Sequence, residues 1–292
     1  MTIVVTGSRG QLGWELCRCL GPRATGLDRA ALDVTDLSAV DRTLRALAPE
    51  AVINTAAYTA VDRAESEPEA CFAANEAAVG HLVAACQALG CPLVQISTDY
   101  VFSGTHGRRH PYREDEPTSP RGVYARSKWA GEEQARRLER HIVVRTCGLY
   151  GRRAPGAAGG NFVDTMLRLS TERPVLKVVD DQICTPSYVP HVAAAVLFLL
   201  AGGHWGTYHV VNQGSTSWFE FAREIFRQIG REIRLEPITT AQYAAPAPRP
   251  AYSVLDTSKY RALDGPELPA WQDALRAYLA ERVTTPSEMN DG

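Results

Sequence analysis

Residues 3–16 of this chain read IVVTGSRGQLGWEL, and this stretch decides the fold. The β-branched run Ile3–Thr6 predicts a strand, a G-x-x-G-x-x-G loop follows it, and a helix is expected to begin there. Small residues in such a loop permit a tight turn and let the backbone approach a pyrophosphate, while the helix N-terminus supplies free N–H groups. The residues predicted to contact a bound dinucleotide here are Gly7, Gly10, Gln11, Leu12 and Gly13. A tight turn that binds no ligand is the alternative.

Strand-like and helix-like segments alternate from residue 1 to about 146. Strands are predicted at Ile3–Thr6, Ala51–Asn54, Leu93–Ser97 and Ile142–Arg145. Helices are predicted around Gln11–Leu20, Leu37–Leu47, Glu69–Leu89 and Tyr124–Arg140. Such alternation is typical of an α/β, Rossmann-type doubly wound parallel sheet covered by helices on both faces.

After about residue 147 the alternation loosens. Gly151–Gly160 is rich in Gly and Ala and predicts a loop, and Ala245–Pro250 (APAPRP) predicts an extended segment. An amphipathic helix is predicted near Pro269–Arg282, followed by a flexible tail over 284–292. We therefore expect a Rossmann domain over 1–146, to which about 187–215 returns, and a smaller mixed α/β substrate-binding lobe over 147–283.

Composition excludes several classes of protein. The 292 residues carry 31 Lys and Arg against 33 Asp and Glu, a net charge of −2, which argues against nucleic-acid partners and a polybasic membrane surface. The longest apolar run, Val192 to Ala201, is about half of the roughly 20 residues that a spanning helix needs. Seven scattered cysteines lack metal-ligand spacing, so we expect no metal and a reducing, cytoplasmic location.

The pair Tyr124 and Lys128 carries the first catalytic signal. Their i,i+4 spacing places both side chains on one face of a helix, where the ammonium is expected to lower the phenol pKa. The tyrosine could then give a proton to a carbonyl oxygen as hydride arrives at its carbon. Lysine is scarce: only three of the 31 basic residues are lysines (Lys128, Lys177 and Lys259), so a chance pairing arises in about one chain in ten. A solvated helix face is the alternative.

Polar residues at predicted strand ends extend this pattern. Thr98 follows a predicted parallel strand, and active sites form at the carboxyl ends of such strands, so Thr98 could donate a hydrogen bond to the same carbonyl. Asp28 lies where a carboxylate binds the adenosine ribose, but nearby Arg9 and Arg29 could accept a 2′-phosphate. The choice between NADH and NADPH therefore stays open. Asp33-Val34 fits an adenine contact or a surface loop.

The substrate-binding candidates lie in the second half of the chain. Asn161 and Arg249, with the loops around them, are predicted to bind a nucleotide diphosphate, because an arginine fork suits phosphate oxygens. An exposed loop arginine in a proline-rich stretch is the alternative for Arg249.

Long strings of this sequence resemble the extended short-chain dehydrogenase/reductases, and more narrowly the dTDP-4-dehydrorhamnose reductase family. The glycine spacing of the first loop is also typical of short-chain dehydrogenases. The strings cover nearly the whole chain: GSRGQLGWEL (7–16), VINTAAYTAVDRAESEPE (52–69), ISTDYVFSG (96–104), PYREDEPTSPRGVYARSKWAGE (111–132), NFVDTMLRL (161–169), VVDDQ (178–182) and RPAYSVLDTSK (249–259).

The resemblance implies a function as well as a fold. It implies NAD(P)H-dependent reduction of the C4 keto group of a dTDP-linked 4-keto-6-deoxysugar, with a catalytic set of Thr98, Tyr124 and Lys128. Thr98 and Asp99 would also contact the sugar, and Tyr124 and Lys128 the cofactor, Lys128 through the nicotinamide ribose. Further implied cofactor contacts are Gly10 to Gly13, Asp28, Asp33, Val34, Ala56, Ala57 and Tyr58.

Two departures fall where the family binds substrate. The family pattern Arg-Thr-Ser-Trp-Val-Tyr-Gly is here Arg145-Thr-Cys-Gly148-Leu-Tyr-Gly151, so the tryptophan that lines the sugar pocket is replaced by Gly148, which removes one pocket wall. The motif Gly-Ser-Pro-Thr is here Cys184-Thr-Pro-Ser187. Some members also bridge a homodimer through Mg²⁺ held by carboxylates; Glu15 matches one such position, but no clear partner appears, so no metal is predicted.

Alternative functions remain. A reductase for a different nucleotide 4-ketosugar in a specialised glycoside or antibiotic pathway fits the departures, and an epimerase would share the fold. The alternative from another class is a non-catalytic regulatory subunit that binds a dinucleotide. The regulatory subunit of methionine adenosyltransferase is a relative with that role. The intact set of Thr98, Tyr124 and Lys128 argues against it.

Overall fold

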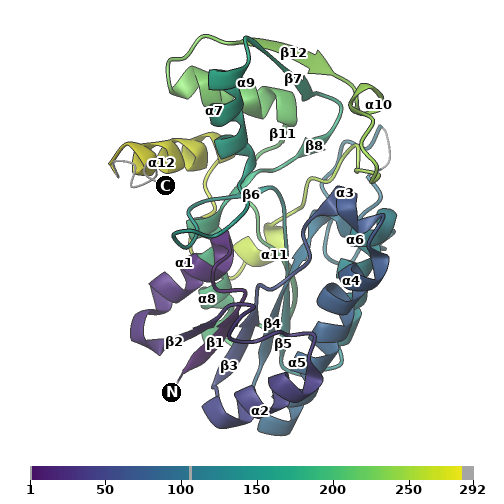
Figure 1. Cartoon of the computed structure of the whole chain (residues 1–292), viewed down its shortest axis with the longest axis vertical. Coiled ribbons are helices and arrows are strands. Elements are labelled where there is room, and N and C mark those ends of the chain that lie inside the picture. The colour runs from purple at the N-terminus through teal and green to yellow at the C-terminus, as the bar shows by residue number, and fades with distance from the viewer. Residues whose placement is uncertain (1, 105–106, 285–292) are drawn as a thin grey trace.

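The computed structural model describes residues 2–104 and 107–284, and its lower half is built on a six-stranded parallel sheet (Figure 1). The strand order β10-β5-β4-β3-β1-β2 and the parallel pairing of every neighbour confirm the Rossmann-type prediction. The strands are β1 (Ile3–Thr6), β2 (Ala24–Leu27), β3 (Ala51–Asn54), β4 (Leu93–Thr98), β5 (His141–Thr146) and β10 (Gly206–His209).

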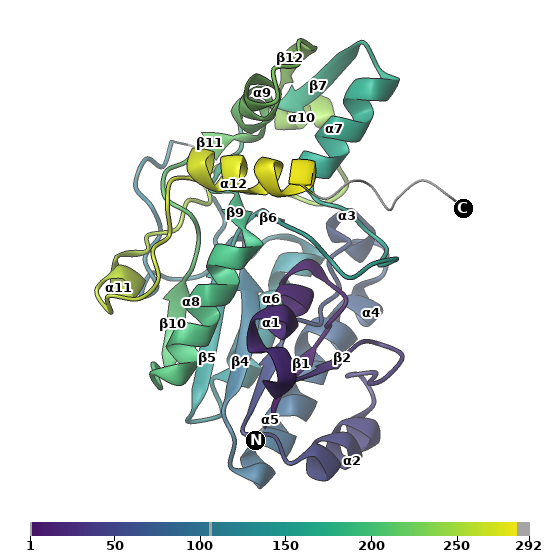
Figure 2. The ribbon, with the colours of Figure 1, turned by 90° about the vertical axis from the view of Figure 1, so that its left-hand side faces the viewer.

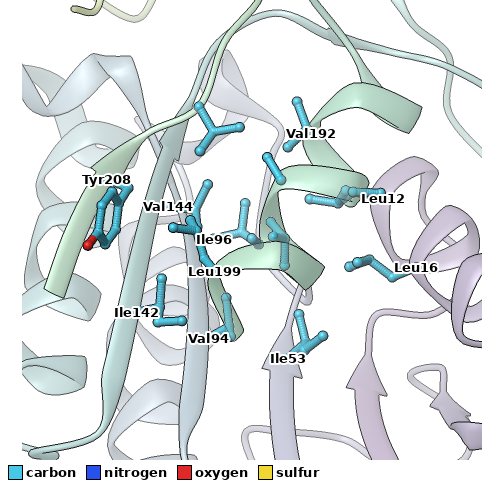
Figure 3. Close-up of a cluster of buried hydrophobic side chains, with 14 of the residues drawn as sticks. Leu12, Leu16, Ile53, Val94, Ile96, Ile142, Val144, Val192, Leu199 and Tyr208 are labelled. Atoms are coloured by element: carbon cyan, nitrogen blue, oxygen red, sulfur yellow. The ribbon is translucent and has the colours of Figure 1, made fainter. Parts of the chain in front are cut away.

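Helices cover both faces of this sheet. On one face lie α1 (Gln11–Leu20) and α8 (Val189–Ala201), which Figure 2 shows in front of the strands. Figure 3 shows Leu12 and Leu16 of α1 and Val192 and Leu199 of α8 meeting side chains from β3, β4, β5 and β10. The opposite face is covered by α2 (Leu37–Leu47), α5 (Ala78–Leu89) and α6 (Gly122–Ala135).

A second group of elements forms the upper part of the molecule in Figure 1. Its strand pairs are β7 (Val175–Val179) with β12 (Arg234–Ile238), β8 (Ile183–Cys184) with β11 (Thr216–Ser217), and β6 (Leu149–Tyr150) with β9 (Ser187–Tyr188). Its helices are α7 (Phe162–Glu172), α9 (Trp218–Gln228), α10 (Thr240–Tyr243) and α12 (Trp271–Thr284). An aromatic-rich core that includes Tyr150, Phe221 and Tyr278 holds these elements together.

Several short elements complete the fold. They are the 3-10 turns η1 (Gly21–Arg23) and η3 (Asp99–Val101) and the helices α3 (Val61–Ala64), α4 (Pro68–Phe72) and α11 (Ser258–Arg261). Between α4 and α5 the chain forms a π-helical turn, Ala73–Ala77, so the single helix predicted over Glu69–Leu89 is wrong in its middle.

Other boundaries shift slightly. The helix predicted at Tyr124 begins at Gly122 and ends at Ala135, and the last helix runs from Trp271 to Thr284. Residues 285–292 of the predicted tail lie outside the described residues. Within the described part of the chain, no helix combines the length and apolar character needed to cross a membrane.

Candidate functional site

Two glycines of the loop after β1 lie so close to neighbouring backbone that no side chain would fit there. Gly7 has φ +68°, and a Cβ there would lie 2.7 Å from Ala56 N. A Cβ at Gly13 would lie 2.4 Å from Gly7 O. Gly10 differs, because a Cβ there would meet only Gly7 O, at 3.3 Å, and the residue faces an open pocket. Packing alone does not explain Gly10, whereas close approach of a pyrophosphate would.

That pocket, of about 240 Å³, is lined by Gly7, Arg9, Gly10, Asp28, Arg29 and Ala30. The Asp28 carboxylate accepts hydrogen bonds from Ala30 N and Ala31 N, at 3.1 and 3.0 Å, which fix it at the carboxyl end of β2. Arg29 is almost fully exposed, and Arg9 Nη2 donates to Pro155 O at 2.8 Å. The carboxylate that is predicted to bind a ribose thus lines the same pocket as two guanidinium groups, which suit phosphate oxygens.

The other predicted cofactor residues surround the same edge of the sheet. Asp33 accepts hydrogen bonds from the Thr35 backbone and hydroxyl, which hold the pKa of its carboxyl below the usual value. Val34 is buried, and Ala56 N donates to Asn54 Oδ1 at 3.2 Å. The remaining predicted contacts are Gln11, Leu12, Ala57 and Tyr58, of which Gln11 and Leu12 begin α1 and Ala57 and Tyr58 follow β3.

The structure brings the three predicted catalytic residues together. Thr98 ends β4, while Tyr124 and Lys128 lie on α6, which packs against that strand. The Lys128 ammonium is buried and donates to Ile96 O at 2.6 Å. The hydroxyl of Tyr124 is hydrogen-bonded to the side chain of Thr98. The Tyr124 ring packs edge to face on Tyr100, with the ring centroids 6.0 Å apart.

Burial determines the protonation of this pair. It raises the pKa of Tyr124 above the usual value, and hydrogen bonding with Thr98 offsets only part of that rise. Burial lowers the pKa of Lys128 to about 8, with the Glu132 charge acting in the opposite direction. The expectation that Lys128 lowers the tyrosine pKa is therefore wrong here, because burial dominates and the ammonium is directed at Ile96 O. A protonated phenol is the form that can donate a proton.

Sequence reasoning missed Asn75, which lies in the π-helical turn. Its side chain accepts from Tyr58 N at 2.9 Å and donates to Tyr58 O at 3.1 Å and to Ser127 Oγ at 2.9 Å. It therefore joins the predicted cofactor-contacting segment to the helix that carries Tyr124. A π-helical turn has no simple sequence periodicity, so nothing in the sequence distinguished Asn75 from other asparagines.

A second cleft, of about 260 Å³, opens between η3, the start of α6 and the proline-rich segment. Its lining residues are Tyr100, Phe102, Ser103, Gly104, Arg121, Pro248, Arg249, Pro250 and Ala251. Arg249, which is predicted to bind the nucleotide diphosphate, lines this cleft, and its guanidinium forms two hydrogen bonds with the Asp62 carboxylate, at 2.9 and 2.8 Å. Arg121, the N-cap of α6, is an exposed cation that the sequence did not single out.

The other two predicted substrate contacts, Asp99 and Asn161, lie in different surroundings. Asp99 follows Thr98, is almost fully buried, and has its carboxyl pKa raised by that burial. Asn161 is the N-cap of α7: its Oδ1 accepts from Asp164 N at 2.9 Å and its Nδ2 donates to Tyr278 Oη at 3.1 Å. It is not among the residues that line this cleft, and its side chain caps α7, while its substrate contact stays a prediction.

The two sequence departures lie beside a different tryptophan. Gly148 has φ +51°, and a Cβ there would lie 3.0 Å from the indole of Trp218. The replacement by Gly148 implied an open space in the pocket wall. Trp218, from the start of α9, packs against this position instead.

Glu15, the position compared with a metal ligand, is paired with the Arg18 guanidinium at 2.6 and 2.9 Å. Over residues 2–104 and 107–284, no group of three or more His, Cys, Asp or Glu side chains is arranged to hold a metal ion.

Comparison with known proteins gives concordant results. The family model described as RmlD substrate binding domain matches residues 1–284. A dTDP-4-dehydrorhamnose reductase of Streptomyces griseus is 43% identical, over 93% of this chain and 91% of that protein. The solved dTDP-4-dehydrorhamnose reductase of Clostridium acetobutylicum superimposes with a TM-score of 0.92 at 35% identity, covering 98% of this chain and 100% of that one. That of Bacillus anthracis, solved in complex with NADP, has a TM-score of 0.91 at 36% identity and covers 96% and 100%.

Proposed function

Because the chain belongs to the RmlD substrate-binding-domain family, that of the dTDP-4-dehydrorhamnose reductases, we propose that it reduces the C4 keto group of a dTDP-linked 4-keto-6-deoxysugar. The cofactor we propose is NADPH, with NADH as a second reductant. The substrate that its family relatives indicate is dTDP-4-dehydrorhamnose, and the product dTDP-rhamnose. The support from the molecule itself is the meeting of Thr98, Tyr124 and Lys128 at the carboxyl end of β4.

The residues around the phosphate loop fit a dinucleotide. Gly10 leaves open space where a pyrophosphate would lie, and the N-terminus of α1 directs backbone N–H groups toward it. Asp28 would hold the adenosine ribose, with Arg9 and Arg29 beside it to neutralise a 2′-phosphate. When bound, the nicotinamide supplies the hydride.

The chain supplies the proton and the orientation. Tyr124, protonated because burial raises its pKa, donates its proton to the C4 carbonyl oxygen as that oxygen gains charge. Thr98 donates a second hydrogen bond to the same oxygen. The Lys128 ammonium, anchored on Ile96 O, places a positive charge beside the developing alkoxide and the nicotinamide ribose.

The cleft beyond η3 is proposed to hold the nucleotide part of the substrate. Tyr100 offers aromatic surface for a base, and Arg249 and Arg121 offer positive charge for the diphosphate. Arg249 would exchange its pair with Asp62 for the phosphate oxygens. Asp99 would contact the sugar next to Thr98.

The test is a steady-state assay of NADPH oxidation with dTDP-4-dehydrorhamnose and with a panel of other nucleotide 4-ketosugars. Tyr124→Phe should lower turnover by about 10²–10⁴-fold, the usual contribution of general acid catalysis, and leave NADPH affinity within about twofold. Full activity in Tyr124→Phe would exclude the assignment of the proton donor. Absence of turnover with every ketosugar would favour a non-catalytic dinucleotide-binding subunit.

One observation favours a variant substrate. Gly148 and the neighbouring indole of Trp218 give this part of the pocket a composition that differs from the family pattern. A different 4-ketosugar is therefore the second candidate, and the substrate panel decides between them by the ratio of kcat/KM values. Action in the cytoplasm and assembly as a homodimer stay predictions.

A further inference from the structure

We propose that Glu132, a fully buried carboxylate on α6, is a positioning residue that maintains the charge of Lys128 and holds the end of β4 in place. This inference rests on the proposed function, since it concerns the same reaction. It begins from a carboxylate whose hydrogen bonds are all made inside the protein.

The Glu132 carboxylate joins three elements. Ser97 Oγ of β4 donates to it at 2.6 Å, and Arg145 of β5 donates through Nε at 2.9 Å and Nη2 at 2.8 Å. Arg136, one turn further along α6, donates through Nη2 at 2.7 Å. A carboxylate that accepts from this many donors on three elements fixes the positions of all of them.

The network adjoins the catalytic residues in both directions. Ser97 directly precedes Thr98, and Ile96, whose carbonyl accepts from Lys128, directly precedes Ser97. Along α6, Lys128 lies one turn before Glu132, so both side chains share a face. Two consecutive residues of β4, Ile96 and Ser97, are therefore bound to Lys128 and Glu132, and the next residue is Thr98.

Electrostatics gives Glu132 a second effect. Burial favours the neutral amine of Lys128 and brings its pKa to about 8, and the negative charge of Glu132 counteracts it. The titratable or charged groups that neighbouring elements direct toward this part of α6 are few. They are Cys71 of α4, Glu65 after α3, Asp99 and Tyr100 of η3, Arg145 of β5 and Cys147 after it, beside Tyr124 and Glu132 of α6 and its C-cap Arg136.

Among these groups, Glu132 is the carboxylate that acts most strongly on the charge of Lys128. Its removal would leave the ammonium near two arginines that lack their common counter-charge. The neutral amine would then form at lower pH, and the hydrogen bond to Ile96 O would lose its charge assistance.

The scarcity of lysine makes the charge of Lys128 directly measurable. With ¹³C-labelled lysine, the full chain gives Cε signals from only Lys128, Lys177 and Lys259, and loss of one signal in Lys128→Arg identifies the site. Titration of that signal reports the charge whether or not the protein turns over a ketosugar. Failure of the proposed function and failure of this inference are therefore distinguishable.

Glu132→Gln, which keeps the shape and an acceptor oxygen, should shift the Lys128 midpoint downward by about one pH unit, a tenfold change in the proton equilibrium. The alkaline limb of the kcat/KM profile should shift with it, because the charged form is lost at lower pH. The matched control is Glu133→Gln, which removes the adjacent but half-exposed carboxylate and should leave both midpoints unchanged.

A second variant tests the opposite sign. Arg136 is about one-third exposed, so Arg136→Gln should fold, and it removes a cation that partly neutralises Glu132. The Lys128 midpoint should then move upward by a few tenths of a pH unit. An unchanged Lys128 midpoint in Arg136→Gln, or a Glu132→Gln variant that loses activity equally at every pH, would overturn the proposal in favour of a purely structural ion pair.

Discussion

Gly131→Ala should disrupt the contact that positions the catalytic helix. Gly131 lies on the face of α6 that packs on the π-helical turn, and a Cβ at this position would lie 2.1 Å from Asn75 O. Ordinary contacts of this kind are 3.4 Å or longer, so α6 and the turn would have to separate by roughly an ångström. The obstacle is a backbone oxygen, which cannot rotate away as a side chain would.

The magnitude follows from two opposing effects. Overpacking a rigid contact costs about 1–3 kcal/mol, while replacing a helical glycine by alanine gains up to about 1 kcal/mol. Asn75 is anchored to Tyr58 and Ser127 by three hydrogen bonds of 2.9 to 3.1 Å, so relaxation is limited and we expect a net loss of about 2 kcal/mol. Turnover should fall as well, because Tyr124 and Lys128 move with α6.

Gly80→Ala is the matched control. Gly80 lies on α5, and a Cβ there would meet only the flexible Gln134 side chain, at 3.5 Å. That variant should be up to about 1 kcal/mol more stable than the parent, with unchanged turnover. Urea unfolding followed by circular dichroism measures both variants. Equal stability of Gly131→Ala and Gly80→Ala would refute the reasoning.

Three further outcomes are expected. Lys128→Arg should lower turnover at least about tenfold in steady-state assays, because a planar guanidinium replaces a compact ammonium at Ile96 O; parent-like turnover would contradict this. Asn161→Ala should cost about 1–2 kcal/mol in urea unfolding while KM stays unchanged, since its amide caps α7; a raised KM without destabilisation would restore it to the substrate site. Gly10→Val should weaken NADPH binding in fluorescence titrations and leave unfolding nearly unchanged, whereas parent-like affinity would show that the pyrophosphate lies elsewhere.

The elements predicted best are those with strong local signals. The predicted bounds of β1, β3, α1 and α2 agree with the structure residue for residue. β-branched runs that end at small or polar residues define the strands. The helix α2 has a clear start because Asp36 caps it, accepting from Ala39 N at 3.0 Å. No distant contact is needed to explain these boundaries.

The π-helical turn could not be predicted because its cause lies elsewhere in the chain. The segment around Asn75 has the composition of an ordinary helix. Its geometry is coupled to Gly131, which lets α6 approach the turn closely, and to Ser127, which accepts a hydrogen bond from Asn75. A tertiary contact more than fifty residues away thus overrides local helix propensity.

Asn161 shows a different limit of sequence reasoning. An asparagine before a helix can cap that helix or reach a ligand, and the sequence looks the same in both cases. In the structure the Asn161 amide donates a hydrogen bond to the hydroxyl of Tyr278, a residue more than a hundred positions later in the chain. Arg249 shows a related limit: the sequence marks it as a candidate phosphate-binding residue, but its pairing with Asp62 depends on a residue far along the chain.

The proposed catalytic pair, Tyr124 and Lys128, combines both situations. Spacing alone placed Tyr124 and Lys128 on one helix face, yet burial raises the pKa of Tyr124 and lowers that of Lys128, and the charge of Glu132 partly offsets the effect on Lys128. The same spacing continues along α6, because Lys128, Glu132 and Arg136 follow one another at intervals of four residues. A charged row on the side of a helix that faces a parallel sheet is costly unless every member is paired. Its presence in the sequence therefore indicates a row of paired charges joined to the catalytic lysine, and the structure supplies the partners in Ser97 and Arg145.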